Sequence, residues 1–324
     1  DAFTEMGCKF IDTKVERHGK NPMKDYQLYR RYVTIIKEVN PVVVLSYTIK
    51  PNIYGGMATA KCKVPFIPNI TGLGSAVQKS GILLSLVTVM YRTAFRKVHC
   101  VFVQNKENEN YFSSHNIAVG KYRLIPGSGV NLNHYIVRPY KEDHGIHFAF
   151  IGRVMREKGI EEYLEAAYAL KKEYSNIYFH VYGFCEEAYE DRLKKLQEQG
   201  VIQYHGMVKD MAEVFETINC SVLPSYHEGM ANSLLEAAAS GRPVIASNIT
   251  GCRETFDEGI SGFGFQVKDS RALIGALRKF LNLTTEERKQ MGLAGRKKVE
   301  TEFDRNIVIN AYINEIKHIS KGER

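Results

Sequence analysis

The sequence predicts an α/β protein with two Rossmann-like domains. Short apolar segments alternate with helix-compatible segments along nearly the whole chain, which is typical of parallel sheets covered by helices. At 324 residues the chain also exceeds a single typical core, so two domains of about 100 to 200 residues each are expected. We place a first domain at residues 1–138, a second at residues 139–303 and a C-terminal helix at residues 304–324. The apolar residues of that helix are expected on one face: Ile307, Ile309, Tyr312, Ile313 and Ile316.

The first domain is predicted from strand-like segments that are apolar and bounded by turn residues. These segments lie at residues 41–47, 64–70, 100–105 and 122–127. Helical stretches near Tyr26–Glu38 and Ser80–Val98 lie between some of them. The alternation therefore indicates a second α/β unit beside the one formed by the carboxy-terminal half.

Apolar segments of the second half end in turn residues that suit ligand binding. Phe148–Ile151 is followed by Gly152, Arg153 and Lys158, whose cationic groups suit phosphate oxygens. The other ends are Gly183 after residues 177–182, His205, Gly206 and Met207 after residues 201–204, and Glu228 after Asn219–Pro224. Because the carboxyl ends of parallel strands meet at one edge of a sheet, these residues are expected to line one crevice. Each glycine taken singly also fits an ordinary turn.

The segment after Asn219–Pro224 is the most informative part of the chain. Glu228 lies in a loop, and Glu236 lies in an Ala- and Leu-rich helical stretch, Ser233–Ser240. A helix N-terminus at a strand end presents unpaired amides to a diphosphate, so the pattern indicates a nucleotide-sugar site. Ser233 and Glu236 also fit an S-x-x-E capping box, which would explain Glu236 without a ligand but would not explain Glu228.

Several functional classes are disfavoured by what the sequence lacks. The six cysteines are scattered without a C-x-x-C pair, which argues against zinc and for reduced thiols in the cytoplasm. Neither G-x-G-x-x-G nor G-x-x-x-x-G-K-[ST] occurs, which argues against dinucleotide binding and P-loop hydrolysis. No stretch approaches the roughly 20 apolar residues of a membrane span, and no recognised motif indicates nucleic acid as a partner.

Basic residues are concentrated in the first domain. Residues 1–138 contain 19 Lys or Arg and 8 Asp or Glu, against 25 and 28 in residues 139–324. Such a surface attracts nucleic acid, anionic lipid or a diphosphate-bearing substrate, and charge alone does not choose between them.

One segment of the first domain suits a membrane surface. Gly81–Tyr91 is mostly apolar, with Lys79 before it and Arg92, Arg96 and Lys97 after it. A helix of this kind can lie among lipid headgroups, which would place the protein peripherally on the inner face of the cytoplasmic membrane. A buried crossover helix with a solvated basic end is the alternative.

These motifs together resemble glycosyltransferase family 4, whose members are retaining enzymes with two domains facing each other across a cleft, the GT-B architecture. The resemblance is carried by the E-x7-E element Glu228–Glu236, by the GR…EKG element Gly152–Gly159 and by residues 251–265. The segments KPNIYG, NITGLGSA, VQNKENENYF and LIPGSGVNLNHY are similar to the acceptor-side half of a branch that acts on lipid-linked sugars. The resemblance covers nearly the whole chain.

The resemblance implies transfer of a hexosyl or N-acetylhexosaminyl group from a nucleotide sugar, favouring UDP, to a glycan or polyprenyl-diphosphate-linked sugar. The implied catalytic residues are Glu228, Arg153 and Lys158, with Glu228 on the hydroxyls of the donor sugar. The ribose is expected at Glu236 and the base near Gly183, Met207 and Val208. The full set of implied donor-binding residues is Gly152, Gly183, Met207, Val208, Gly229, Met230, Ala231, Asn232, Ser233, Leu235 and Glu236.

The acceptor side departs from the family pattern. Many relatives carry a histidine where Thr71 stands, so a histidine-mediated role is not transferred. Gly72 and Gly74 would bring backbone amides to the donor phosphates, and Lys50 and Asn52 would meet an acceptor phosphate; a plain turn and a solvated lysine are the alternatives. We expect about one β-α unit of the first domain to be absent from the numbering, and the C-terminal helix to cross back to that domain.

Breaking a glycosyl-diphosphate bond leaves negative charge on the diphosphate, which therefore needs positive groups. The sequence has no Asp-x-Asp pair for a divalent ion, so Arg153, Lys158 and the helix amides near Ser233–Leu235 are expected to act without a metal or other cofactor. Fold alone does not establish transfer. A nucleotide-sugar epimerase would consume donor without acceptor, a nucleotide-binding pseudoenzyme would bind without turnover, and a nucleic-acid-binding protein would show a steep salt dependence.

Overall fold

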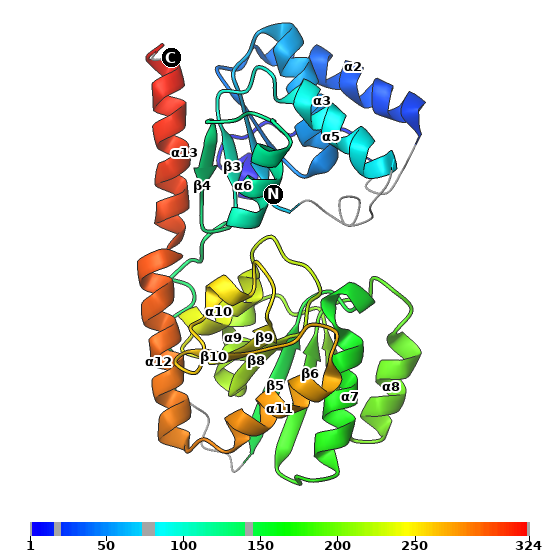
Figure 1. Cartoon of the computed structure of the whole chain (residues 1–324), viewed down its shortest axis with the longest axis vertical. Helices are drawn as coiled ribbons and strands as arrows, with labels where there is room; N and C mark the ends of the chain where they lie inside the picture. The colour runs from blue at the N-terminus through cyan, green and yellow to red at the C-terminus, as the bar shows by residue number, and fades with distance from the viewer. Residues whose placement is uncertain (1, 16–20, 73–81, 140–144, 323–324) are drawn as a thin grey trace. The chain divides into compact units, whose positions relative to one another are not determined.

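The computed structural model describes residues 2–15, 21–72, 82–139 and 145–322, which form an α/β protein (Figure 1). The chain divides into two compact units. The first contains Asp1–Leu124 and Tyr312–Arg324, and the second contains Ile125–Ala311. The first unit thus ends ahead of the boundary expected at residue 138, and the end of the C-terminal helix is grouped with it.

The second unit is built on a six-stranded sheet in which all paired strands are parallel, in the order β10-β9-β8-β5-β6-β7. The strands are β5 (Ile146–Ile151), β6 (Ile177–Tyr182), β7 (Gln203–Gly206), β8 (Cys220–Leu223), β9 (Val244–Ser247) and β10 (Gly262–Phe265). Chain order reverses where β5 pairs with β8. Ligands of open α/β sheets bind at such a switch point, outside the carboxyl ends of the strands.

Helices cover both faces of this sheet (Figure 1). Phe148 and Phe150 of β5 pack with α7 (Ile160–Lys171), α8 (Glu190–Glu198) and α11 (Ser270–Leu281). Ala149 and Ile151 point to the other face and pack with α9 (Met211–Thr217) and α10 (Asn232–Ala239). This alternation follows from the two-residue period of a strand and explains why the predicted strand reads as continuously apolar. A further helix, α12 (Thr285–Glu302), begins with a Thr284–Glu287 capping box.

The first unit contains a four-stranded parallel sheet in the order β1-β2-β3-β4. Its strands are β1 (Val44–Tyr47), β2 (Phe66–Ile70), β3 (Val101–Val103) and β4 (Tyr122–Leu124). Its helices are α1 (Ala2–Glu5), α2 (Pro22–Val39), α3 (Ile49–Cys62), α5 (Ile82–Ala94) and α6 (Lys106–Ser114). A cluster of edge-to-face and stacked rings, Phe66, Tyr91, Phe95 and Phe112, fills its core. Each strand lies within a segment predicted from the sequence, and the predicted fold class is confirmed.

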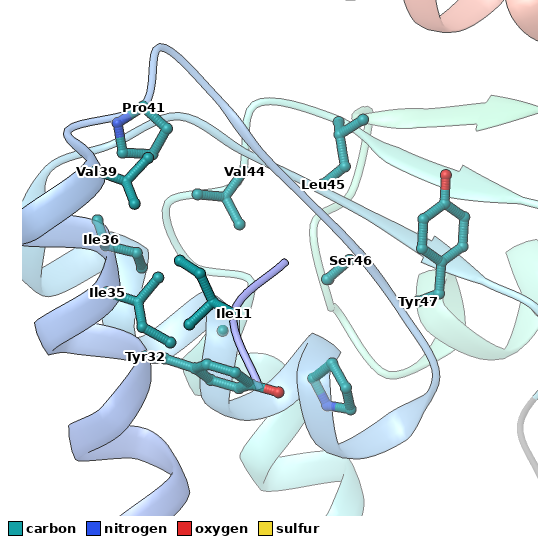
Figure 2. A pocket seen from close by; sticks show the side chains of 12 residues that line it. Ile11, Tyr32, Ile35, Ile36, Val39, Pro41, Val44, Leu45, Ser46 and Tyr47 are labelled. Atoms are coloured by element: carbon teal, nitrogen blue, oxygen red, sulfur yellow. The ribbon is translucent and has the colours of Figure 1, made fainter. Parts of the chain in front are cut away.

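A cavity of about 490 Å³ lies beside β1, the edge strand of this sheet (Figure 2). Tyr32 and Ile36 of α2 line one part of it, and Ile11 and Val44 line another. Its lining is almost entirely apolar, and Tyr47 at the end of the strand is 47% exposed. The edge of β1 is therefore less densely covered than the sheet centre, where β2 is buried throughout.

The last helix, α13 (Arg305–Ser320), is divided between the two units. Its predicted apolar face is wrong in part, because Ile307, Ile309 and Ile313 are each at least 40% exposed. The buried residues of this helix include Val308 and Glu315. A period-3.6 pattern of isoleucines therefore did not identify the packed face, which polar contacts of Glu315 help to set.

Candidate functional site

The loops after β5 and β8 meet at the switch point of the second sheet. Lys158 ends a short 3-10 helix, η1 (Arg156–Lys158), and forms an ion pair with Glu228; the two side chains are 18% and 11% exposed. The Ser225 hydroxyl donates to Glu228 Oε1 at 2.7 Å. Gly159 has φ +74°, and a Cβ there would lie 2.0 Å from the carbonyl oxygen of Pro224. The structure thus brings together the predicted residues Lys158 and Glu228 on two closely apposed loops.

The ends of β5, β6 and β7 are joined by backbone hydrogen bonds. The Gly152 amide donates to the Tyr182 carbonyl at 3.0 Å, and the Gly183 amide donates to the Gly206 carbonyl at 2.7 Å. Gly183 has φ +136°, and a Cβ there would lie 1.8 Å from the Gly152 carbonyl oxygen. Only glycine fits this position, so Gly183 is more than an ordinary turn residue. Arg153, on the same loop as Gly152, forms an ion pair with Glu186.

Apolar side chains are exposed beyond the ends of β6 and β7. Phe184 is 45% exposed and Met207 is 75% exposed, whereas Val208 packs against the core. His205 stacks on Tyr182 with ring centroids 4.3 Å apart, and burial lowers the pKa of His205, which favours the neutral imidazole. This edge therefore offers apolar surface to a planar ring.

The backbone from Glu228 to Ala231 is held by Gly251, in the loop after β9. The Ala231 amide donates to the Gly251 carbonyl at 2.8 Å. Gly251 has φ +86°, and a Cβ there would lie 2.6 Å from the Glu228 carbonyl oxygen and 2.8 Å from that of Gly229. Gly251 was not named as a site residue from the sequence, although it begins the segment 251–265 that carries the family resemblance.

Helix α10 begins without a side-chain cap. Its N-cap residue is Ala231 rather than Ser233, so the capping-box explanation of Glu236 is wrong. The amides of Leu234 and Leu235 donate to the Ala231 carbonyl at 3.0 and 3.3 Å. The expectation that Leu235 offers its amide to a phosphate therefore needs correction. Among the described amides from Ser233 to Leu235, that of Ser233 makes no hydrogen bond to the Ala231 carbonyl.

Glu236 is half-buried on the second turn of α10. Burial raises the pKa of its carboxyl, although a hydrogen bond with Tyr135 and the nearby Arg305 and His134 act to lower it. His134 Nε2 in turn lies 3.0 Å from Asp210 Oδ1. Tyr135, Arg305 and His134 were missed from the sequence, because no spacing links residues so far apart in the chain.

The segment after β4 lies in the second unit, although the resemblance had assigned it to the acceptor side. Gly127 has φ +61°, and a Cβ there would lie 2.6 Å from Met230 Cγ. The Ser128 hydroxyl donates to Asn232 Oδ1 at 3.3 Å. Residues 126–131 therefore support the loop that carries Met230 and Asn232. This correction follows from the glycines, which allow the close approach.

The predicted acceptor-side residues of the first unit lie near strand ends. Two of them, however, form hydrogen bonds or an ion pair with other residues of the same unit. Asn52 is 1% exposed; its Oδ1 accepts from the Ser46 hydroxyl at 2.6 Å, and its Nδ2 donates to the Asn69 carbonyl at 2.9 Å. Lys50 Nζ lies 2.6 Å from Asp25 Oδ1. Asn52 is therefore a structural residue rather than an acceptor contact. Thr71 and Gly72 follow β2, and Gly74 lies outside the described residues.

The predicted membrane segment forms α5, which has two faces. Val87, Tyr91 and Ala94 are buried in the core, whereas Leu86 and Val89 are 54% and 53% exposed. The helix is therefore a packed crossover helix that also presents apolar residues to the surface. The basic residues Arg92, Arg96 and Lys97 are exposed, and Lys79 lies outside the described residues. Across the described residues, none of the helices has the length and apolar character needed to span a bilayer.

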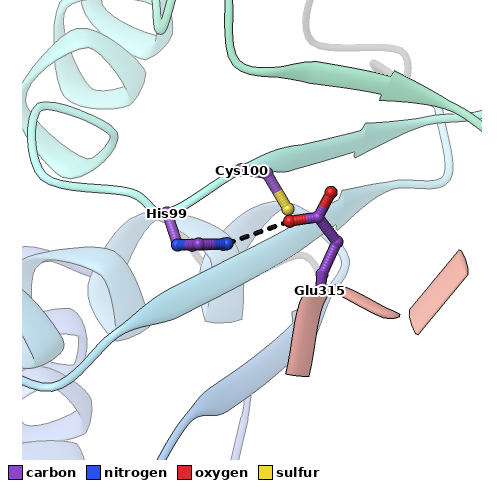
Figure 3. A group of neighbouring side chains, drawn as sticks. All are labelled: His99, Cys100 and Glu315. Carbon is purple, nitrogen blue, oxygen red and sulfur yellow. Dashed lines mark hydrogen bonds and ion pairs between the residues drawn. The ribbon is translucent and has the colours of Figure 1, made fainter. Parts of the chain in front are cut away.

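One cluster of the described residues has the donor types of a metal site: His99, Cys100 and Glu315, with ligand atoms within 4.8 Å of one another (Figure 3). Glu315 accepts from His99 Nε2 at 2.9 Å and from Arg123 Nε at 2.6 Å. Burial raises the pKa of the Cys100 thiol to about 12, so the thiolate that a metal needs is disfavoured. The residues fit a hydrogen-bonded anchor of α13 better than a metal site.

Two family models match the chain. The model described as glycosyl transferases group 1 matches residues 138–298, and the one described as glycosyl transferase 4-like matches residues 3–105. The first match contains the loops after β5, β6, β8 and β9 described above, and the second contains β1, β2 and β3.

Curated relatives carry transferase names. N,N'-diacetylbacillosaminyl-diphospho-undecaprenol alpha-1,3-N-acetylgalactosaminyltransferase of Campylobacter jejuni is 25% identical over 95% of this chain and 85% of its own length. The capsular polysaccharide biosynthesis glycosyltransferase CapM of Staphylococcus aureus is 29% identical over 49% of this chain and 42% of its own length.

Solved structures share the fold. Sucrose-phosphate synthase from Thermosynechococcus elongatus has a TM-score of 0.79 at 19% identity and covers 96% of this chain and 81% of its own. Anabaena Alr3699/HepE in complex with UDP and glucose has a TM-score of 0.75 at 18% identity, covering 89% of this chain and 80% of its own. With both halves matched by the family models and the fold shared, the chain belongs to the group 1, 4-like glycosyltransferases of GT-B fold and is a glycosyltransferase.

Proposed function

We propose that this protein transfers a sugar from a UDP-sugar to a polyprenyl-diphosphate-linked sugar during surface glycan assembly, with retention of anomeric configuration. The observation that carries the donor half of the proposal is the Lys158–Glu228 pair at the switch point of the second sheet. A carboxylate and an ammonium fixed together at that edge suit a sugar hydroxyl and a phosphate on either side of one glycosidic bond.

The leaving diphosphate is stabilised by groups already in place. Lys158 and Arg153 are both paired with carboxylates in this structure, so each ammonium or guanidinium group is held in position before the donor arrives. When the donor binds, its phosphate oxygens compete with Glu186 for the half-exposed Arg153, and the Ser233 amide adds a further donor. Preorganised positive groups of this kind stabilise developing negative charge without reorganisation, and they make a divalent ion unnecessary.

The nucleoside end is recognised on the other side of the same edge. Glu236 binds the ribose hydroxyls as an acceptor, held by Tyr135. The uracil ring lies near Gly183, against the exposed side chains of Phe184 and Met207. Apolar surface beside backbone carbonyl and amide groups suits a flat base with polar edges.

The lipid-linked acceptor is proposed from two features. The Campylobacter jejuni relative that aligns over 95% of this chain is named for a diphospho-undecaprenol substrate. Exposed Leu86 and Val89 lie on α5, whose last turn contains Arg92, and Arg96 and Lys97 lie just beyond the helix; this arrangement suits peripheral contact with anionic headgroups. The acceptor sugar would then approach the strand ends of the first unit.

The membrane contact is tested with vesicles of phosphatidylglycerol and phosphatidylcholine. Replacing Arg96 and Lys97 by Ser should weaken binding to the anionic vesicles by about tenfold or more, since each basic residue near the surface contributes about 1 kcal/mol. The matched control replaces Lys194 and Lys195 on α8 of the second unit by Ser. Equal loss in both variants, or binding that ignores anionic lipid, would contradict this contact.

The transfer itself is tested by incubating the full chain with UDP- and GDP-sugars, with and without a polyprenyl-diphosphate sugar, in buffer containing EDTA. Product is expected only with a UDP-sugar and the lipid-linked acceptor, and it should persist in the chelator. Consumption of donor without acceptor would indicate an epimerase, and UDP binding without any turnover would indicate a pseudoenzyme.

A further inference from the structure

One row of side chains lies across the first sheet just behind the ends of its strands. Tyr47 of β1, Asn69 of β2 and Phe102 of β3 are register partners, and side chains paired in this way share one face of a sheet. Tyr312 of α13 contacts all three. Asn69 Nδ2 donates to Tyr312 Oη at 2.7 Å, and the Tyr312 ring centroid lies 4.2 Å from that of Phe102 and 6.5 Å from that of Tyr47.

Asn69 is buried and hydrogen-bonds several neighbouring side chains. It is 3% exposed, and its Oδ1 accepts from Gln104 Nε2 at 3.3 Å. Its backbone carbonyl accepts from Asn52 Nδ2 at 2.9 Å. A buried amide that loses one partner leaves a polar group without water or protein to satisfy it, which is costly. The Tyr312 hydroxyl is therefore an integral part of this network.

The loops that leave the sheet begin one or two residues beyond this row. Thr48 follows Tyr47 and has φ +68°, a conformation that a β-branched residue adopts only when its surroundings impose it. Thr71 and Gly72 follow Asn69 by two and three positions, and Gly72 has φ +145°. A row that fixes the strand ends therefore also fixes where these loops start.

We propose that Tyr312 is a positioning residue for the acceptor: its hydroxyl holds Asn69, and through Asn69 it sets the placement of the Thr71–Gly72 turn to which the acceptor sugar binds. The inference rests on the proposed function, because it assigns the acceptor to the strand ends of the first unit. Burial raises the pKa of Tyr312, so the hydroxyl stays protonated while it accepts from Asn69, and the Tyr47 ring lies beside it.

The test is Tyr312→Phe in the full chain, which removes the hydroxyl and keeps the ring against Phe102. With a UDP-sugar saturating, kcat/KM for the lipid-linked acceptor should fall about five- to tenfold, the factor expected for one buried hydrogen bond. UDP affinity should stay within about twofold, because Tyr312 belongs to the unit that does not contain Lys158, Glu228 or Glu236.

The matched control is Tyr111→Phe, which removes a hydroxyl bonded to Thr88 Oγ1 at 2.7 Å in the same unit but outside the row. It should leave acceptor kinetics unchanged. Wild-type kinetics in Tyr312→Phe, or the same loss in the Tyr111 variant, would overturn the inference. If Tyr312→Phe fails to fold, Tyr47→Phe on the exposed edge should show a smaller fall in kcat/KM for the lipid-linked acceptor. Unchanged acceptor kinetics in Tyr47→Phe would then overturn the inference. A wild-type chain that does not transfer at all would instead refute the proposed function.

Discussion

The strand ends of the two sheets are fixed in different ways. In the second unit, glycines bring neighbouring loops into backbone contact: Gly159 against Pro224, Gly183 against Gly152 and Gly251 against Glu228. In the first unit, side-chain hydrogen bonds fix the strand ends. Asn69 is bonded to Asn52, Gln104 and Tyr312, and these bonds join β2 to α3, the end of β3 and α13.

The difference bears on what each half can recognise. A site fixed by backbone contacts has no room for side-chain change, which suits a ligand that always presents the same diphosphate. A site fixed by side-chain hydrogen bonds can be altered one partner at a time, at about 0.5 to 1.5 kcal/mol for each bond. Under the proposed function, we therefore expect the first unit to be the half in which acceptor preference can change without loss of the fold.

The largest effect is expected from Gly183→Ala. The added methyl group would lie 1.8 Å from the Gly152 carbonyl oxygen at φ +136°, so the loop that carries Arg153 must move. Overpacking and backbone strain each cost about 1 to 3 kcal/mol, and we expect a loss of about 3 kcal/mol or more in urea unfolding, with loss of UDP binding. The control is Gly200→Ala, at φ +69° with open space around it, which should cost about 1 to 2 kcal/mol. Equal costs would show that close approach does not matter at Gly183.

Glu228→Gln tests the charge pair that the glycines hold in place. Loss of the carboxylate removes the ion-pair partner of Lys158 and the group that would accept a hydrogen bond from a hydroxyl of the donor sugar. We expect kcat to fall about a hundredfold or more, as for other preorganised electrostatic groups. The measurement is initial rate at saturating donor and acceptor, with UDP affinity measured separately. Glu161→Gln, which breaks the surface pair with Arg192, is the control and should leave kcat unchanged. Full activity in Glu228→Gln would remove this residue from the site.

Glu236→Gln should weaken uridine binding by about tenfold, because hydrogen bonds to charged groups contribute about 1.5 to 3 kcal/mol and an amide retains part of that. Burial raises the pKa of Glu236, so in the wild type uridine affinity should fall as pH drops through this raised value and the carboxyl takes up a proton. The Gln variant should show no such pH dependence. Uridine is used because it has no phosphate to titrate. The same raised pKa makes the group's contribution to folding stability decline as pH rises through that window.

The sequence predicted the fold well where local pattern decides structure. The strand Phe148–Ile151 lies within β5, and the helical stretch Tyr26–Glu38 lies within α2. The predicted domain boundary did not fall where the units divide. The chain from Ile125 onward packs on the second unit through close approaches at Gly127 and Gly129, and contacts of that kind leave no periodic signal.

The candidate site was predicted only as far as strand ends allow. Lys158 and Glu228 were expected together because parallel strands end at one edge, and the structure brings them together. The partners of Lys50, Arg153 and Glu236 were not predicted. Asp25, Glu186 and Tyr135 each lie 25 or more positions away in the chain, and a side-chain pair at that separation depends on packing that no local pattern encodes.

The smallest effect is expected at a side-chain contact of the first unit. Glu315 is 8% exposed; burial acts to raise its pKa, but hydrogen bonds from Arg123 and His99 outweigh burial and lower it. A carboxyl whose pKa is lowered by folding stabilises the fold at pH values above its pKa in the unfolded chain. This stabilisation is lost as the pH falls through its pKa in the folded protein. Glu315→Gln should therefore cost about 1 kcal/mol at about pH 7, a figure reduced because Arg123 is half exposed, and almost nothing at about pH 3. Urea unfolding at the two pH values measures this. A cost of 3 kcal/mol or more would mean that the side-chain-held half is as intolerant as the glycine-held half, and the contrast between the two sheets would fail.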